Sequence, residues 1–270
     1  MPTPEFVIAD TITSLPPDVK GQVVVSGSHG GIYPGYLAAK AHVRAVILND
    51  AGVGKDEAGI ESLGYLDQYG IAAATVSHLS CRIGDTADML ARGRISHANE
   101  AARKAGVAPG MLCREAIGHL AQAEAIMADP PPLREGRDEV QGSPGSRRSI
   151  RLLDSAAMVT PEDAGHIVVT GSHGGLVGGE PRMALRTDAF AAVFHDAGVG
   201  IDGAGLTRLP ALDQRGIAAI TVEAASARIG DARSIFEEGV VSALNAAAMR
   251  LGARHGLPAR DLVRRWTYLP

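Results

Sequence analysis

The chain is poor in cysteine, in aromatic residues and in basic charge, and each shortage excludes a class of protein. Its two cysteines, Cys81 and Cys113, are too few for a disulfide framework. Aromatic residues make up 4% of the sequence, which leaves few rings for stacking on nucleic-acid bases. A formal net charge of −4 also gives no basic footprint for a phosphate backbone. We therefore expect no nucleic-acid partner.

Long apolar runs are missing as well. No run approaches the roughly 18 apolar residues of a membrane-spanning helix. Residues 1–5 lack the basic stretch followed by an apolar one that is typical of a signal peptide. Because the low cysteine content also fits a reducing compartment, these features predict a cytoplasmic protein without a membrane partner.

An internal duplication is the main feature that the sequence does contain. Four motifs occur twice in the same order, with offsets of 144 or 146 residues. They are VVVSGSHGG and IVVTGSHGG (23–31 and 167–175), NDAGVG and HDAGVG (49–54 and 195–200), LDQYGIAA and LDQRGIAA (66–73 and 212–219), and RIGD (82–85 and 228–231). We divide the chain into repeat 1 (1–128), a linker (129–148) and repeat 2 (149–270).

Each repeat alternates apolar strand-like runs with helix-like segments. Continuous β-branched runs that end in glycine are typical of buried parallel strands. In repeat 1 we expect strands at 6–9, 22–26, 45–49 and 71–76, and helices at 35–41, 56–68 and 85–104. The equivalent of the last helix carries apolar residues at helical spacing in repeat 2, namely Ile235, Val240 or Val241, Leu244, Ala248 and Leu251. The pattern predicts an α/β fold of duplicated βαβ-type units, with parallel sheets and pseudo-two-fold halves.

The linker is rich in proline, glycine and charged residues and has no apolar period. A connection of about 20 residues without structure is unusually long. Two interpretations remain open, a flexible tether between the repeats and a lid over a site.

The repeated motifs place polar groups at one edge of each predicted sheet. The GSHGG, DAGVG and RIGD motifs each follow a predicted strand. Because ligands of parallel α/β sheets bind beyond the carboxyl ends of the strands, this convergence predicts a small-molecule site.

The GSHGG motif offers two kinds of group to a ligand. Its consecutive glycines can present backbone N–H groups to an anion, or they can serve only a tight turn. Its serine can bind a ligand, or it can attack one if a base lies within hydrogen-bond reach. The candidate donors are Gly30, Gly31, Gly174 and Gly175, and the candidate hydroxyls are Ser28 and Ser172.

Histidine and aspartate supply the candidate acid–base groups. His29 and His173 occupy equivalent positions in the two glycine loops, and imidazole titrates near neutral pH. Asp50 and Asp196 end the next strand. Each carboxylate has four interpretations, which are to orient the histidine, to bind a metal, to hold a substrate hydroxyl, or to cap its own turn.

Arginine is the remaining repeated polar group. Arg82 and Arg228 begin the RIGD motifs, where a guanidinium can clamp a carboxylate or phosphate. The alternative is an ion pair within the same repeat, for which Asp67 and Asp213 are the candidate acids. HExxH and paired CxxC motifs are absent, and we expect no metal and no cofactor.

These residues favour an enzyme that acts on a small polar or anionic metabolite, most simply a hydrolase or a lyase. A nucleotide-binding enzyme of the NAD(P) type is the first alternative, because a glycine loop precedes a strand ending in an acid. A non-catalytic assembly or regulatory protein is the second. A homo-oligomer is compatible with the sequence, but nothing in it defines the oligomeric state.

Overall fold

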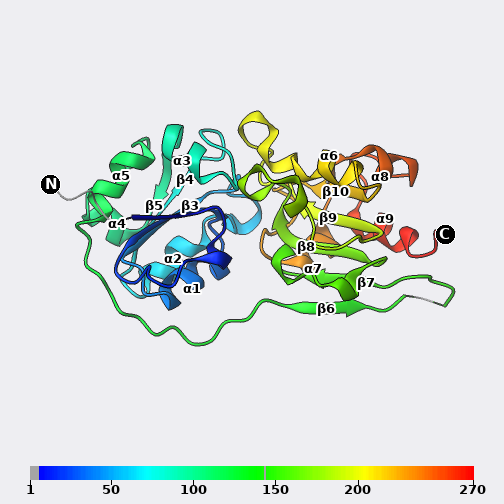
Figure 1. The fold of residues 1–270 in the computed structure, drawn as a ribbon, viewed down its shortest axis with the longest axis horizontal. Coiled ribbons are helices and arrows are strands. Elements are labelled where there is room, and N and C mark those ends of the chain that lie inside the picture. Colours follow the sequence, from blue (N-terminus) through cyan, green and yellow to red (C-terminus); the bar gives the residue numbers. More distant parts are fainter. Residues whose placement is uncertain (1–5, 143) are drawn as a thin grey trace.

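The computed structural model describes residues 6–142 and 144–270 and places one mixed, mostly parallel sheet in each repeat (Figure 1). This confirms the α/β class and the two similar halves. Residues 1–5, on which the expectation of no signal peptide rests, lie outside the described residues. Within the described part of the chain, no helix combines the length and the apolar character needed to cross a membrane.

The sheet of repeat 1 has five strands in the order β1-β2-β3-β4-β5. Strands β1 to β4 run parallel, and β5 pairs antiparallel with β4. The strands are β1 (Phe6–Ala9), β2 (Val23–His29), β3 (Ala45–Asn49), β4 (Ala72–Val76) and β5 (Ile95–Ala98). The helices are α1 (Ile32–Lys40), α2 (Glu61–Asp67), α3 (Thr86–Arg92), α4 (Glu100–Lys104) and α5 (Cys113–Leu120), with short 3₁₀ turns η1 (Ile12–Ser14) and η2 (Lys55–Glu57).

The sheet of repeat 2 has six strands in the order β11-β10-β9-β8-β7-β6. Its two edge strands, β11 and β6, are antiparallel to their neighbours. The strands are β6 (Arg137–Val140), β7 (Ile150–Leu153), β8 (Ile167–His173), β9 (Ala191–His195), β10 (Ala218–Val222) and β11 (Val241–Leu244). The helices are α6 (Arg208–Asp213), α7 (Ala232–Glu238), α8 (Ala246–Arg250) and α9 (Ala259–Trp266), with 3₁₀ turns η3 (Ala156–Met158), η4 (Pro161–Asp163), η5 (Val177–Gly179), η6 (Pro181–Met183) and η7 (Ile201–Leu206).

Both faces of each sheet are buried, which explains the unbroken apolar runs. In β2, Val23 and Val25 pack into the core on one face, while Val24 packs into the core on the other. Equivalent residues of β8 divide in the same way. A strand covered on both faces has no polar side, and its sequence is therefore a continuous apolar run rather than an alternation.

The prediction of one long helix at 85–104 is wrong. The chain forms α3, the antiparallel edge strand β5 and then α4. Gly93 ends α3, and Asn99 starts α4 by accepting a hydrogen bond from the backbone of Ala102. In repeat 2 the supposed helical face is likewise divided among α7, β11 and α8. Short apolar elements in succession imitate a helical period.

The helix predicted at 56–68 is shorter than expected. Asp56 and Glu57 have φ values of 52° and 59°, so the chain makes a left-handed turn before α2 begins at Glu61. The residue types at these positions do not reveal the turn, because acidic residues are also common in the first turn of a helix.

The linker is partly structured. Its residues Arg137–Val140 form β6, which pairs antiparallel with β7 and becomes the edge of the second sheet. Figure 1 shows the linker leaving α5, passing along the molecule and reaching β6. The linker is therefore more than a free tether, because its last part belongs to the fold of repeat 2.

The repeats meet at their DAGVG motifs through reciprocal contacts. Lys55 donates its N–H to the carbonyl of Ala224 at 2.8 Å, and Ile201 donates to that of His78 at 2.9 Å. A methyl group on Gly52 would lie 2.8 Å from the Cα of Gly198, so the two backbones touch. Alanine and isoleucine side chains from both repeats fill this junction. The contacts support the expected pseudo-two-fold arrangement.

Candidate active site between the two repeats

A cavity of about 300 Å³ lies between the repeats and is lined by both. The ends of β2 and β8, the turns η1 and η3, and the start of α1 form its walls. Five of the predicted site residues line it, namely Ser28, His29, Ser172, His173 and Arg228. Each repeat alone would present only part of this lining, so the site depends on how the repeats pack.

His29 and His173 reach across the interface in a reciprocal way. If Gly230 carried a methyl group, that carbon would lie 3.3 Å from Cε1 of His29. A methyl group on Gly84 would lie 3.4 Å from Cε1 of His173. Each imidazole therefore packs against the RIGD loop of the opposite repeat.

Backbone hydrogen bonds fix which nitrogen of each ring carries the proton. Gly31 donates its N–H to Nδ1 of His29 at 3.1 Å, and Gly175 donates to Nδ1 of His173 at 3.2 Å. A nitrogen that accepts is unprotonated, so the neutral rings carry their proton on Nε2. Burial lowers the pKa of His29 to about 4, and the neighbouring His195 adds to this shift. Burial, Arg208 and His29 lower the pKa of His173 well below its usual value. At neutral pH both rings are therefore neutral hydrogen-bond donors.

The two serines are held by backbone groups rather than by a base. The Ser28 hydroxyl oxygen accepts the N–H of Ile12 at 3.0 Å, and that of Ser172 accepts the N–H of Ala156 at 2.9 Å. Among the described residues, no histidine or carboxylate accepts a hydrogen bond from either hydroxyl. Neither serine is thus activated as a nucleophile in this arrangement, but each hydroxyl hydrogen remains available to a ligand.

The glycine-loop N–H groups do not point to a ligand. Gly30 and Gly174 donate to the carbonyls of Asn49 and His195, at 2.8 and 2.7 Å. Gly31 and Gly175 donate their N–H groups to Nδ1 of the histidine in their own loop. These amides are already used and cannot also form an oxyanion hole. The glycines instead allow close packing.

Substitution of Gly174 by alanine is expected to destabilise the fold. The new Cβ would lie 2.3 Å from the carbonyl oxygen of Gly205 and 2.8 Å from Cγ2 of Thr221. Overpacking of this kind costs about 1–3 kcal/mol. Gly64→Ala in α2 is the control, because nothing lies within 4 Å of its Cβ and alanine favours a helix by about 1 kcal/mol. Urea unfolding checks both; equal stability of the two variants would contradict the packing role.

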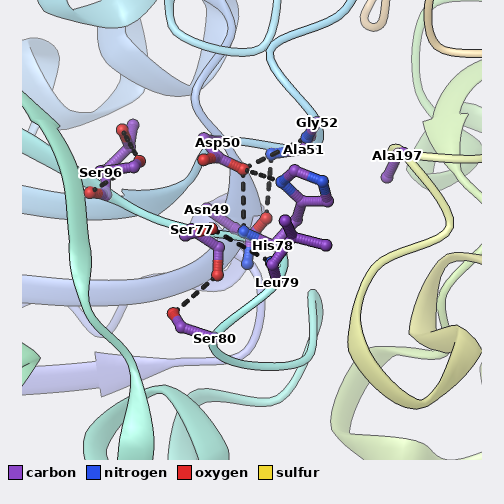
Figure 2. Close-up of polar contacts among 12 residues, drawn as sticks. Asn49, Asp50, Ala51, Gly52, Ser77, His78, Leu79, Ser80, Ser96 and Ala197 are labelled. Carbon is purple, nitrogen blue, oxygen red and sulfur yellow. Dashed lines mark hydrogen bonds and ion pairs between the residues drawn. The ribbon is translucent and has the colours of Figure 1, made fainter.

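Asp50 orients a histidine, but not the predicted one. Its Oδ1 accepts hydrogen bonds from Nδ1 of His78 at 2.8 Å, from the His78 backbone at 2.9 Å and from Gly52 (Figure 2). Burial acts to raise the Asp50 pKa, but the hydrogen bonds from His78 hold it below its usual value. Among the described residues, Asp196 accepts only the backbone N–H groups of Gly198 and Ala224. Neither carboxylate lines the cavity, so both act as turn-forming groups at the junction.

The repeated arginines form ion pairs across the interface. Nη2 of Arg82 lies 2.9 Å from the Asp202 carboxylate, and Nη1 of Arg228 lies 3.1 Å from that of Asp56. Arg228 also pairs with Glu61. Arg82 also lies 3.6 and 3.7 Å from the carboxylates of Asp85 and Asp88 in its own repeat. Pairing within one repeat therefore occurs, but the predicted partners Asp67 and Asp213 are wrong.

The two acids expected to pair with these arginines cap helices instead. Asp67 accepts the N–H of Glu100 at 3.0 Å, and Asp213 accepts that of Ala247 at 2.8 Å. Each carboxylate thus lies at a helix N-terminus, where the helix dipole favours negative charge.

Arg208, at the start of α6, is a cavity residue that the sequence analysis misses. It is 4% exposed, and its guanidinium donates to the carbonyls of Gly175 and Met183, both at 3.0 Å, and to that of Ala184. Burial lowers its pKa to about 10, so it stays charged at neutral pH. The one signal in the sequence is a difference between the copies, since Ser62 occupies the equivalent position in repeat 1.

Glu135 is the second missed residue, and it comes from the linker. Leu133, Arg134 and Glu135 line the cavity, and the next residue, Gly136, donates its N–H to Asp154 at 2.6 Å. Burial and the neighbouring Asp154 carboxylate raise the pKa of Glu135 to about 7. A carboxyl group in this range can both take and give a proton at neutral pH.

Metal and nucleotide ligands find little support in this geometry. Across residues 6–142 and 144–270, no group of three or more metal-binding side chains is close enough to hold an ion. For a dinucleotide, Asp50 or Asp196 would have to hold ribose hydroxyls. Both are buried against backbone N–H groups, with exposures of 2% and 4%.

The chain matches no family model, no curated protein and no solved structure.

Proposed function

We propose that this chain is an enzyme that acts on a small polar or anionic metabolite, as a lyase or a hydrolase, in the cavity between the repeats. The observation that carries the proposal is a pair of imidazoles, one from each repeat, that line one cavity as neutral Nε2–H donors; His173 is buried and His29 is partly buried. Donors fixed in advance of the reaction are what a developing oxyanion requires. Two serine hydroxyls add further polar groups to the same space.

In this proposal His29 and His173 polarise a substrate carbonyl rather than shuttle protons. A ring whose Nδ1 already accepts a backbone N–H has no free site for a second proton, and its lowered pKa keeps it neutral. A neutral imidazole can still stabilise an enolate or a tetrahedral oxyanion through its Nε2–H. This role differs from the acid–base role that the sequence predicts for the same two residues.

The proton then moves through Glu135. Its pKa of about 7 lets the carboxylate remove a proton from carbon, or from water, and return it later. Removal of a proton next to the polarised carbonyl gives an enolate, and a lyase reaction follows when the enolate expels a leaving group from the neighbouring carbon and that group takes up the proton held by Glu135. Attack of water on the carbonyl, with the water proton passing through Glu135 to the leaving group, is hydrolysis. Hydrolysis in this site would use water directly rather than a covalent serine intermediate, because neither serine has a base that could activate it.

A thermal-shift panel tests the ligand class directly. It contains small carboxylates, amides, sugar phosphates, NAD(P) and nucleotides, each with the wild type and with Ser28→Ala/Ser172→Ala. A ligand at 100 times its Kd adds about 2.7 kcal/mol, which moves the Tm by a few degrees. We expect a shift with small carboxylates or amides that shrinks in the double variant. A shift with nucleotides alone would replace this proposal by the nucleotide alternative.

A further inference from the structure

Arg208 is a buried cation whose partners are all uncharged. Its Nε and Nη1 donate to three backbone carbonyls, and its guanidinium carbon lies 5.1 Å from the centre of the Phe194 ring. Among the described residues, Nη2 has no hydrogen-bond partner and no carboxylate pairs with the group. Isolated buried charges are costly, so they are normally paired.

Other arginines of this chain show what pairing looks like here. Arg228 lines the same cavity, but its charge is neutralised by Glu61 and Asp56. Arg137 lies against the buried carboxylate of Asp163 at 2.6 Å. Arg208 is more buried than either, and no described carboxylate pairs with it. A negatively charged ligand in the cavity would supply the missing counter-charge.

The duplication provides an internal comparison. The N–H of Arg208 donates to the Gly174 carbonyl, and the N–H of Ser62 donates to the Gly30 carbonyl, both at 2.8 Å. The backbones are therefore equivalent, and only repeat 2 carries the cation. The Ser62 hydroxyl is buried, and no residue that the structure describes gives it a hydrogen-bond partner. Arg208 thus adds to the cavity lining a positive charge that has no counterpart at the equivalent position of repeat 1.

We infer that Arg208 binds the carboxylate of a small monoanionic substrate. The second oxygen of this carboxylate would then lie between His29 and His173. The inference rests on the proposed function, because it names the substrate class for the same cavity. Four arginines and four acidic residues line that cavity, so a single negative charge fits better than the two of a phosphate ester. The free Nη2, the Nε2–H groups and the serine hydroxyls are all donors, which suits a ligand rich in acceptor oxygens.

Calorimetric titration with matched pairs tests the inference. Pyruvate, lactate and glycolate are compared with their primary amides, and inorganic phosphate is a separate arm, all at pH 7.5. We expect the wild type to bind at least one carboxylate roughly 10- to 100-fold more tightly than its amide, as for hydrogen bonds to charged groups. Arg208→Gln should lose that preference, and Arg208→Lys should keep part of it. Arg182→Gln is the control, because this arginine lies in the nearby η6 turn with 82% of its side chain exposed.

Each outcome decides between the alternatives. Equal wild-type binding of acid and amide, tighter binding of phosphate, binding of none of the acids, or an unchanged preference in Arg208→Gln would overturn the inference. If Arg208→Gln fails to fold, the wild-type pairs and Arg208→Lys still decide. Carboxylate binding that depends on Arg208 without any turnover supports the inference and counts against the proposed enzyme. Turnover of an uncharged substrate would support the proposed enzyme and count against the inference about Arg208.

Discussion

Replacement of both His29 and His173 by alanine is expected to lower kcat by at least about 10³-fold, since removing one such donor typically costs 10²–10³-fold. Both rings line one cavity with Nε2 as the donor. Their effects should not simply add, because two donors to one oxygen act as a unit. Steady-state kinetics on the two single variants and the double variant measure the loss.

Two controls separate chemistry from folding in this experiment. Glutamine at either position keeps an N–H donor and should recover part of the activity, which a purely structural histidine would not predict. His255→Ala removes an exposed histidine that is bonded to the Ser242 carbonyl at 2.8 Å, and it should leave kcat unchanged. Full activity in the double alanine variant would remove both histidines from the mechanism.

Replacement of Glu135 by glutamine is expected to lower kcat by about 10²–10⁴-fold, the usual contribution of a general acid or base. Because burial and Asp154 raise its pKa to about 7, the wild-type kcat/KM should rise with pH through about 7. Glutamine cannot titrate, so the residual activity of the variant should be flat in this range. The lowered histidine pKa values predict no further change between pH 6 and 8.

The same residue has a stability signature that needs no substrate. The folded-state pKa of Glu135 lies above its usual value, so the folded protein holds this proton more tightly than the unfolded chain. The free energy of unfolding should therefore fall in the wild type as pH rises from about 4.5 to 7, and Glu135→Gln should lack that part of the fall. Urea unfolding across this range measures it. A parallel pH dependence in the two proteins would mean that Glu135 has an ordinary pKa.

Much of the fold can be predicted because the repeats carry strong local signals. The apolar runs 22–26 and 45–49 lie in strands buried on both faces, as their continuous apolar character predicts. The segment 85–104 is mispredicted because Ile95–Ala98 is too short to break an apparent helical period. Only pairing of this segment with β4 reveals a strand, and that contact is not encoded locally.

The site can be predicted only in part, for a similar reason. His29 and His173 stand out because each lies in a repeated glycine loop, but their convergence on one cavity depends on how the repeats pack. Asp50 follows a strand as expected, yet its neighbour across the sheet edge is His78. Arg208 begins an ordinary helix and Glu135 lies in a charged linker. Neither belongs to a repeated motif, so a comparison of the motifs shared by the two copies passes over both.

Solvent deuterium exchange tests the central claim most directly, because it reports proton transfer whatever the product is. The wild type and the His29→Ala/His173→Ala variant are incubated in D₂O with a mixture of small oxo-, hydroxy- and amino-carboxylates, and proton NMR follows each C–H signal. We predict that the wild type removes the signal next to the carbonyl of at least one acid, or converts that acid, and that the variant does neither. Unchanged spectra with the wild type, or equal changes with the variant, would contradict the claim that this cavity is an active site.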